Sequence, residues 1–154
     1  MTVQTIAQYL PEHPFFAGLD PAVLELAAGC AVNVHFRPGE FLFHEGDPAD
    51  TFYVLRRGRV SIQMRTPTKD VVLDVAQDDD VVGWSWLIAP YRWTFDARAT
   101  EDTTAIAFDG ACLRGKCEED AALGYALLQR VVHVMSGRLQ SARVRLLDLY
   151  GGNQ

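Results

Sequence analysis

The sequence has few cysteines, and their number and spacing exclude several kinds of site. Its 154 residues contain 3 cysteines, at positions 30, 112 and 117, which is fewer than an iron–sulfur cluster with four thiolate ligands requires. No histidine lies near Cys112 or Cys117 in the sequence, which argues against a zinc site. An odd number of widely separated cysteines is typical of a reducing compartment. We therefore expect reduced thiols, a cytoplasmic location and no bound metal.

Positive charge is scarce as well. The chain has 14 lysines and arginines against 20 aspartates and glutamates, which gives a formal net charge of −6. Non-specific binding to nucleic acid needs a basic face, so we expect no nucleic-acid partner for this chain. Residues 1–16 lack the pattern of a signal peptide, and no apolar run approaches the length of a membrane span. We therefore expect no contact with a membrane.

What the sequence does contain is a series of short strands that follows a helical region. In the helical region, Asp20 is a typical N-cap and Pro21 a typical first helical residue. Residues 31–108 then alternate apolar and polar positions between turn residues, which predicts a sandwich or a barrel. Residues 83–89 interrupt this series, and their pattern indicates a short helix after a glycine.

The region after residue 110 predicts a long helix with a regular apolar seam. The seam positions, separated by 4, 3, 4, 3, 4 and 3 residues, are Leu128, Val132, Met135, Leu139, Ala142, Leu146 and Leu149. This is the spacing of the a and d positions of a coiled coil. A second apolar stripe occupies only the first half and consists of Leu123, Leu127, Val131 and Val134.

These two stripes predict how the long helix packs. The first half is expected to pack on its own domain while it meets a second copy, and the second half is expected to meet the second copy alone. The alternative is a helix packed wholly on its own barrel. Three arginines on the second half are expected to form salt bridges across the coiled coil: Arg138, Arg143 and Arg145.

The segment from Pro38 to Ile62 carries the most specific pattern in the chain. Its turn and strand residues include Pro38, Gly39, Glu40, Gly46, Asp47, Ala49, Asp50, Tyr53, Gly58 and Val60. Here the sequence resembles the cyclic-nucleotide-binding domain of catabolite activator and Fnr-type regulators, of the protein kinase A regulatory subunit and of cyclic-nucleotide-gated channels. The resemblance implies a mainly β fold with flanking helices. Residues 1–120 would form an eight-stranded β-roll (a jelly roll or double-stranded β-helix) with N-terminal helices, and residues 121–150 a long C-terminal dimerisation helix.

The resemblance also implies where a ligand would bind. In the family, a glycine opens a short helix whose N–H groups meet the cyclic phosphate, a glutamate follows to accept the ribose hydroxyl, and a later arginine pairs with the phosphate. Gly83 matches the glycine, but Trp84 replaces the glutamate and cannot accept a hydrogen bond. The arginine position falls near Trp93 or Thr94, and Arg92 is the nearest arginine. The candidate ligand-binding residues are Gly83, Trp84, Ser85, Arg92, Trp93 and Thr94.

Two functions fit this cassette. The first is a regulatory sensor that binds cyclic AMP, cyclic GMP or a similar small anion and signals through its dimerisation helix. The second is a structural dimerisation or protein-interaction module, with an unknown partner, whose pocket is filled by Trp84 or Trp93; either indole could instead stack on a planar ligand.

An enzyme is not expected, because the carboxylates of Asp78, Asp79 and Asp80 have no nucleophile or activated partner beside them. The family's regulators carry a helix-turn-helix after the dimerisation helix, and no such segment follows here. We therefore expect a stand-alone domain with no DNA reader, the alternative being a DNA-binding domain outside this sequence.

Overall fold

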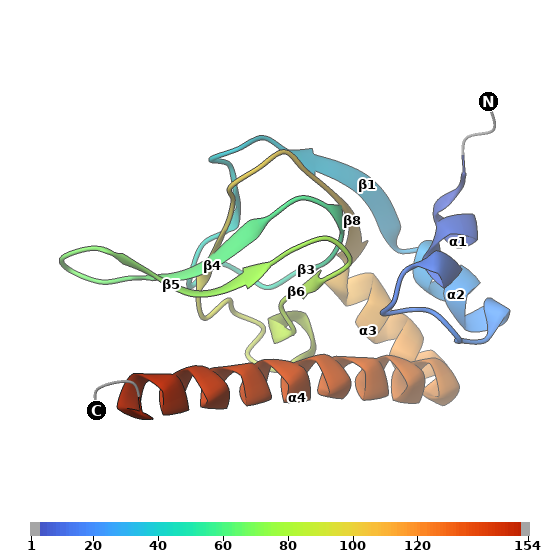
Figure 1. Cartoon of the computed structure of the whole chain (residues 1–154). Coiled ribbons are helices and arrows are strands. Elements are labelled where there is room, and N and C mark those ends of the chain that lie inside the picture. The colour runs from blue at the N-terminus through green and yellow to red at the C-terminus, as the bar shows by residue number, and fades with distance from the viewer. Residues whose placement is uncertain (1–3, 152–154) are drawn as a thin grey trace.

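The structure is a computed structural model that describes residues 4–151, and it contains two four-stranded antiparallel sheets with helices before and after them (Figure 1). The strand orders are β1-β8-β3-β6 and β2-β7-β4-β5. The strands are β1 (Ala31–Phe36), β2 (Phe41–Phe43), β3 (Thr51–Arg57), β4 (Val60–Arg65), β5 (Asp70–Ala76), β6 (Val81–Val82), β7 (Asp96–Ala99) and β8 (Thr103–Asp109). The helices are α1 (Ile6–Tyr9), η1 (Leu10–Glu12), α2 (Pro21–Ala28), η2 (Ser85–Leu87), α3 (Gly110–Glu119) and α4 (Ala121–Gly151). This architecture confirms the expected mainly β fold of eight strands with flanking helices.

The alternating strand pattern places one set of apolar side chains between the two sheets. Leu55 of β3, Val60 and Ile62 of β4 and Ala97 of β7 are buried together in this interior. The tight connection between β3 and β4 depends on Gly58, whose φ is +121° and whose Cβ, if present, would overlap Thr103. Only glycine fits such a position, which explains why the sequence has one there.

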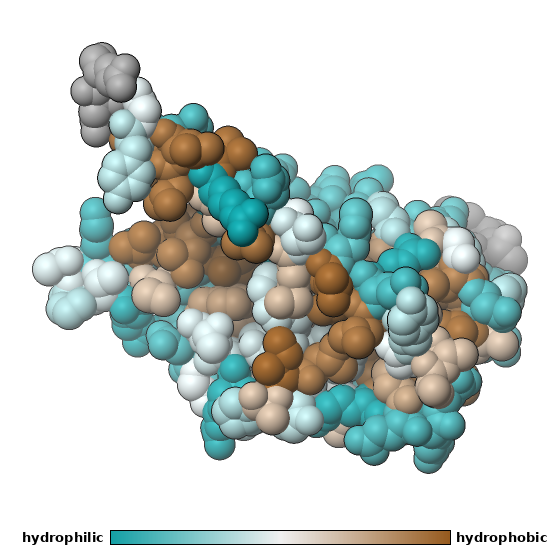
Figure 2. All heavy atoms as spheres, turned by 90° about the horizontal axis from the view of Figure 1, so that it is seen from below, coloured by the Kyte–Doolittle hydropathy of each residue, from teal (hydrophilic) through white to brown (hydrophobic). Residues whose placement is uncertain are grey.

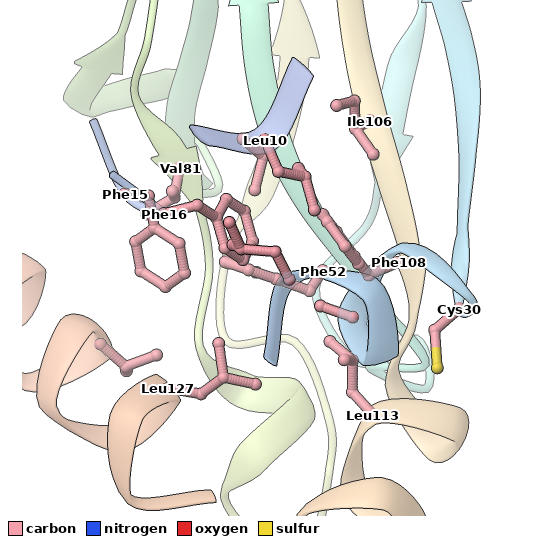
Figure 3. Packing of buried hydrophobic residues seen from close by; sticks show 14 of the residues in the cluster. Leu10, Phe15, Phe16, Cys30, Phe52, Val81, Ile106, Phe108, Leu113 and Leu127 are labelled. Atoms are coloured by element: carbon pink, nitrogen blue, oxygen red, sulfur yellow. The ribbon is translucent and has the colours of Figure 1, made fainter. Parts of the chain in front are cut away.

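A second hydrophobic cluster joins the first sheet to the helices (Figure 3). Phe52 of β3 and Phe108 of β8 point from the sheet toward Leu113 of α3 and Leu127 of α4. All four side chains are almost completely buried. The cluster therefore fixes the first half of α4 and all of α3 against the sheet, on the side away from the interior between the sheets.

Two of the helix predictions can be compared with the structure directly. Helix α2 begins as expected, with Pro21 as its first residue and the Asp20 side chain accepting a hydrogen bond from the Ala22 N–H at 2.9 Å. The expected helix at residues 83–89 is shorter: it is the single 3-10 turn Ser85–Leu87, which has Trp84 rather than Gly83 as its N-cap.

The first half of helix α4 packs on its own domain, as its shorter apolar stripe predicted, whereas the meeting of its seam with a second copy stays a prediction. Leu123, Leu127 and Val131 are buried, whereas every residue from 141 to 150 is exposed. Its 31 residues correspond to a length of about 46 Å at 1.5 Å per residue. The buried residues of α4 are therefore confined to its first half, and the end of the helix is exposed. Within residues 4–151, no helix combines the length and the apolar character needed to span a membrane.

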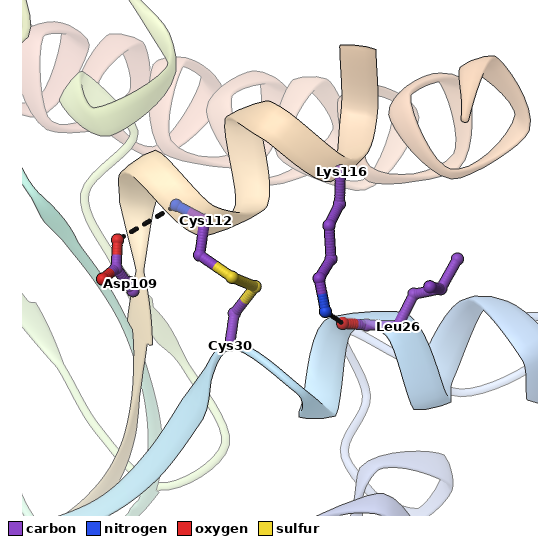
Figure 4. The surroundings of a disulfide bond; sticks show 5 residues. All are labelled: Leu26, Cys30, Asp109, Cys112 and Lys116. Carbon is purple, nitrogen blue, oxygen red and sulfur yellow. Dashed lines mark hydrogen bonds between the residues drawn. A yellow bond between two sulfur atoms is a disulfide. The ribbon is translucent and has the colours of Figure 1, made fainter. Parts of the chain in front are cut away.

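The expectation of reduced thiols is wrong for two of the three cysteines. Cys30 and Cys112 form a disulfide with their Cα atoms 5.8 Å apart, although 82 residues separate them in the sequence, and Cys117 is free (Figure 4). The pairing of β1 with β8 brings them together, because Ala31 lies opposite Phe108 and the Asp109 N–H donates to the Cys30 carbonyl at 2.8 Å. Spacing along the sequence could not reveal a contact that depends on strand pairing.

The buried imidazole of His13 makes folding stability depend on pH. Its Nδ1 accepts a hydrogen bond from the Phe15 N–H at 3.1 Å, so the proton of the neutral ring lies on Nε2 and is donated to the Leu55 carbonyl at 3.0 Å. Burial lowers the pKa of His13 below its ordinary value of 6.5, although the bond to Leu55 and the charges of Asp79 and Asp80 oppose this shift. The folded chain therefore resists a protonation that the unfolded chain accepts.

We expect the free energy of unfolding to fall as the pH decreases from 6.5 toward the lower folded-state pKa of His13. The unfolded state binds the extra proton in this window, so His13 contributes a slope of at most about 1.4 kcal/mol per pH unit. Urea unfolding from pH 7.5 to 5.5 measures the slope, which His13→Gln should reduce. His133→Gln, at an exposed position on α4, is the matched control. An unchanged slope in His13→Gln would contradict this assignment.

Candidate functional site

The expected cassette connects the two sheets. It starts after β6, which pairs with β3 in one sheet, and it ends at β7, which pairs with β2 and β4 in the other. Gly83 directly follows β6, is buried and has a φ of +82°. A side chain at this position would be strained by the backbone conformation alone. The glycine that the sequence singled out is therefore required by the turn.

Trp93 lies directly against Gly83. The indole is 3% exposed, and a Cβ built on Gly83 would overlap its six-membered ring. On its other side the indole stacks on Phe43 of β2, with ring centroids 3.6 Å apart and planes 5° from parallel. Trp93 thus belongs to the hydrophobic cluster between the sheets and fills the space in front of the Gly83 turn.

The other two tryptophans lie elsewhere. Trp86 is fully buried in the second hydrophobic cluster and stacks on Phe52 at 5.2 Å between ring centroids. Trp84 is partly buried at the edge of the same cluster, with the Arg138 guanidinium 5.9 Å from the centre of its ring. Only Trp93 of the three therefore enters the interior between the sheets.

The remaining candidate residues do not gather around Gly83. Ser85 is buried in the 3-10 turn, whereas Arg92 and Thr94 are exposed on either side of Trp93. Neighbouring residues of an extended segment point to opposite sides, so a buried Trp93 leaves these two residues facing outward. The Arg92 guanidinium donates to the Gly46 carbonyl at 3.1 Å. This hydrogen bond attaches the Arg92 side chain to the surface loop that contains Gly46.

Comparison with known proteins identifies the family to which this fold belongs. The family model described as "Cyclic nucleotide-binding domain" matches residues 33–120. The chain belongs to the cyclic nucleotide-binding domain family. A relative is the CRP-like cAMP-activated global transcriptional regulator of Mycobacterium tuberculosis, 26% identical over 135 residues, which are 87% of this chain and 58% of that protein. The chain thus spans a little over half the length of this curated relative.

Two further matches show how widely the domain is used. A solved structure of a putative cyclic nucleotide-binding protein from Geobacter metallireducens superposes with a TM-score of 0.80 at 28% identity, covering 90% of this chain and 99% of that one. The patatin-like phospholipase domain-containing protein 7 of Mus musculus is 33% identical over 139 residues, but the match covers only 10% of that protein. The fold resemblance thus extends over nearly the whole of this chain.

Relative to the family pattern, this cyclic nucleotide-binding domain keeps the glycine and lacks the two side chains expected to recognise the nucleotide. Trp84 stands at the position of the glutamate, and its indole can donate but not accept a hydrogen bond. The residue that enters the interior near the arginine position is Trp93, while Arg92 holds the Gly46 loop. The side chains that line the interior beside Gly83 are therefore apolar and aromatic.

The domain also contains a polar cluster that sequence reasoning missed. The Asp96 carboxylate is 5% exposed, accepts a hydrogen bond from the Glu45 N–H at 2.7 Å, and lies 3.7 Å from His44 Nδ1 and 3.6 Å from the Arg65 guanidinium. Its neighbour Ala97 faces the interior, so Asp96 lies on the outer face of the second sheet. Within residues 4–151, no group of three or more histidine, cysteine, aspartate or glutamate side chains is arranged to hold a metal ion.

Two arginines of α4, Arg138 and Arg145, contact β5 and β6 of their own domain. Arg138 forms an ion pair with Asp74 of β5 at 3.2 Å and donates to the Val81 carbonyl. Arg145 lies 3.9 Å from the same carboxylate and donates to the Leu73 carbonyl. Both side chains thus have partners in their own domain, and the pairing across a coiled coil that was expected for Arg138, Arg143 and Arg145 stays a prediction. Their spacing on the helix fits β5 equally well, and the sequence could not distinguish these two partners.

An open hollow of about 570 Å³ lies outside the roll, between the β5–β6 turn and the middle of α4. Charges of both signs line it, together with the imidazole of His133: Asp74, Asp79, Asp80, Arg130 and Arg138. Arg138 is paired with Asp74, and Arg130 donates to the Phe15 carbonyl at 3.2 Å. Of these two guanidinium groups, Arg138 is therefore paired with a carboxylate, whereas Arg130 is held by a neutral carbonyl and keeps its positive charge beside the hollow.

Proposed function

We propose that this chain is a regulatory domain whose roll interior is filled by Trp93 instead of a cyclic nucleotide and whose output is dimerisation through α4. The observation that carries this proposal is the position of Trp93, which lies against Gly83 and stacks on Phe43. Ligand recognition of the family kind would require the phosphate to approach the Gly83 turn, and the indole occupies that approach.

The chemistry of the interior supports the same proposal. A cyclic phosphate carries a negative charge, and bringing an unpaired charge into an apolar environment is costly. The neighbours of Trp93 include Phe43, Leu55, Val82 and Ala97, all apolar. Arg92 is bound to a carbonyl on the surface, so the phosphate would lack the arginine that the family uses. Trp84 stands in place of the glutamate, so the ribose hydroxyl would lack its acceptor.

Dimerisation is supported by the exposed seam of α4. Five seam residues are half or more exposed: Leu128 (50%), Val132 (54%), Leu139 (53%), Leu146 (56%) and Leu149 (68%). The view from below shows hydrophobic residues gathered along the face of the molecule that carries α4 (Figure 2). An exposed apolar seam of this kind is typical of an interaction surface. A second copy of this chain presents the same seam and is the partner that we propose; the net charge of −6 favours a protein over a nucleic acid.

A second candidate function is a sensor for cyclic AMP, cyclic GMP or another small anion, in which Trp93 leaves the interior when the ligand enters. It is favoured by the retained Gly83 turn and by a relative that is named as a cAMP-activated regulator. In this case the Gly83 turn, Ser85 and a displaced tryptophan stacked on the base would hold the ligand. Both candidates are regulatory roles without catalysis, and they differ in whether the interior opens.

Titration with nucleotide distinguishes the two candidates. With cyclic AMP or cyclic GMP at millimolar concentration we expect no heat of binding and no shift of Tm. A ligand present at 100 times its Kd would stabilise the fold by about 2.7 kcal/mol, which corresponds to several degrees in Tm. The paired variant Trp84→Glu with Trp93→Arg restores both family side chains and is expected to gain binding. Heat and a Tm increase in the native chain, both weakened in Ser85→Ala, would instead establish the sensor.

A further inference from the structure

We propose that Cys30 and Cys112 form a reversible thiol–disulfide site, whose substrates are cellular dithiols and their disulfides, and whose reduction loosens α3 and the cassette that α3 holds. The proposal does not depend on whether the roll interior is filled or open. It gives the domain an input that requires no nucleotide.

The disulfide joins two junctions of the fold (Figure 4). Cys30 lies between α2 and β1, and Cys112 lies in the first turn of α3, where the Asp109 side chain caps the helix by accepting from the Cys112 N–H at 3.0 Å. Helix α3 leads directly into α4. The bond therefore ties the start of the roll to the helices that end the chain.

The surroundings of the pair favour exchange at Cys112. Cys30 is 7% exposed, whereas Cys112 is only partly buried and is the more accessible of the two. A cysteine in the first turn of a helix has its thiolate stabilised by the helix dipole, which favours the release of Cys112 from a mixed disulfide. Lys116 lies one turn further along α3 and donates to the Leu26 carbonyl of α2 at 2.9 Å, which is a second contact between the two helices beside the disulfide (Figure 4). The Asp109 carboxylate is the opposing charge at this site.

The exchange is a two-electron step in which atoms balance. A thiolate of a reducing dithiol attacks the Cys112 sulfur, the bond to Cys30 breaks, and Cys30 leaves as a thiolate that takes up a proton. The second thiol of the reductant then attacks the reductant's first sulfur in the mixed disulfide and releases Cys112 as a thiolate. The reductant becomes a disulfide and the protein gains two thiols; oxidation by a disulfide reverses both steps.

Helix α3 connects this site to the cassette. Arg114 donates to the Trp86 carbonyl, and its guanidinium lies 4.1 Å from the centre of the Tyr91 ring. Both partners belong to the segment between Gly83 and Trp93. Once the disulfide is reduced, the first turn of α3 loses its covalent tie, and Arg114 is the side chain through which the change reaches the cassette.

The third cysteine provides an internal control. Burial raises the pKa of the Cys117 thiol, and the charges of Asp120 and Glu118 act in the same direction. A neutral thiol is a poor nucleophile, so Cys117 is expected to stay reduced and outside the exchange. Its backbone is packed closely against Gly124 of α4.

The test uses the full chain equilibrated in buffers of different ratios of reduced to oxidised dithiothreitol. After alkylation in denaturant, which exposes all free thiols, mass spectrometry should show that Cys30 and Cys112 titrate together, while Cys117 is alkylated throughout. Hydrogen exchange of residues 84–93 and 110–119 should be at least about tenfold faster in the reduced chain than in the oxidised chain. Cys117→Ser should behave as the native chain does, and Cys30→Ala with Cys112→Ala should exchange quickly in every buffer.

Three results would overturn the proposal. The first is a pair that stays reduced in the most oxidising buffer, and the second is oxidation that joins Cys112 to Cys117. The third is equal exchange in the two segments whichever state the pair is in. Because the native chain alone gives all three readouts, the test does not depend on the folding of the double variant.

Discussion

Replacing Trp93 with alanine is expected to lower the free energy of unfolding by about 3–5 kcal/mol, the usual cost of removing a large buried aromatic side chain. The indole is 3% exposed, stacks on Phe43 and contacts Gly83, so the surrounding strands cannot close the space without moving the β6–η2 turn. Urea unfolding, followed by far-UV circular dichroism, measures the loss. This prediction addresses directly whether the interior of the roll is part of the core.

Trp84→Ala is the matched control, because it removes the same side chain from a partly exposed position in the same segment. It should cost clearly less than Trp93→Ala. If Trp93→Ala were no more destabilising than this control, the indole would not be filling the interior in solution, and the proposal of a self-filled roll would fail. Trp93→Ala should also be titrated with cyclic nucleotide, since binding that appears only in this variant would show that the indole blocks the site.

Replacing Leu139 with aspartate is expected to raise the dimer dissociation constant at least about 100-fold. In a two-fold symmetric coiled coil each substitution occurs twice at one seam, so two apolar contacts are lost and two carboxylates are brought together. Fully burying a leucine is worth about 1.5–3 kcal/mol, and every 1.4 kcal/mol corresponds to a factor of ten. Leu139 is 53% exposed in the single chain, so its loss should not unfold the domain.

Sedimentation velocity over a range of concentrations measures this effect. Gln140→Asp places the same charge one residue further along, beside β5 and off the seam, and should leave the dimer intact. Circular dichroism of Leu139→Asp should remain that of the native chain. A native chain that sediments as a monomer at tens of micromolar would remove the dimer proposal altogether.

The parts of this fold that follow from local periodicity could be predicted from the sequence. Alternation over residues 31–108 predicted the strands, and the shorter stripe on α4 predicted that Leu123 and Leu127 would pack on their own domain. Asp20 and Pro21 marked the start of α2 correctly. In each case the residues that indicate the helix or strand lie within that element or directly beside it.

The parts that depend on which segments meet in space could not be predicted in the same way. The disulfide requires the β1–β8 pairing, and the partner of Arg138 is Asp74 on β5, far away in the sequence. The cassette was left with two possible plugs, Trp84 and Trp93, because an irregular loop has no periodicity that fixes which side chain points inward. Only three-dimensional placement distinguishes them.

The two arginines that hold β5 have a mechanical consequence. Arg138 and Arg145 lie seven positions apart on α4, about 10 Å along its axis, yet both contact the same Asp74 carboxylate, at 3.2 and 3.9 Å. A helix that is held to one carboxylate from two of its turns resists sliding lengthwise, since a shift stretches these contacts. Rotation or tilting of α4 would instead move the β4–β5 hairpin with it. A displacement of one end of the helix would therefore be transmitted to this single hairpin.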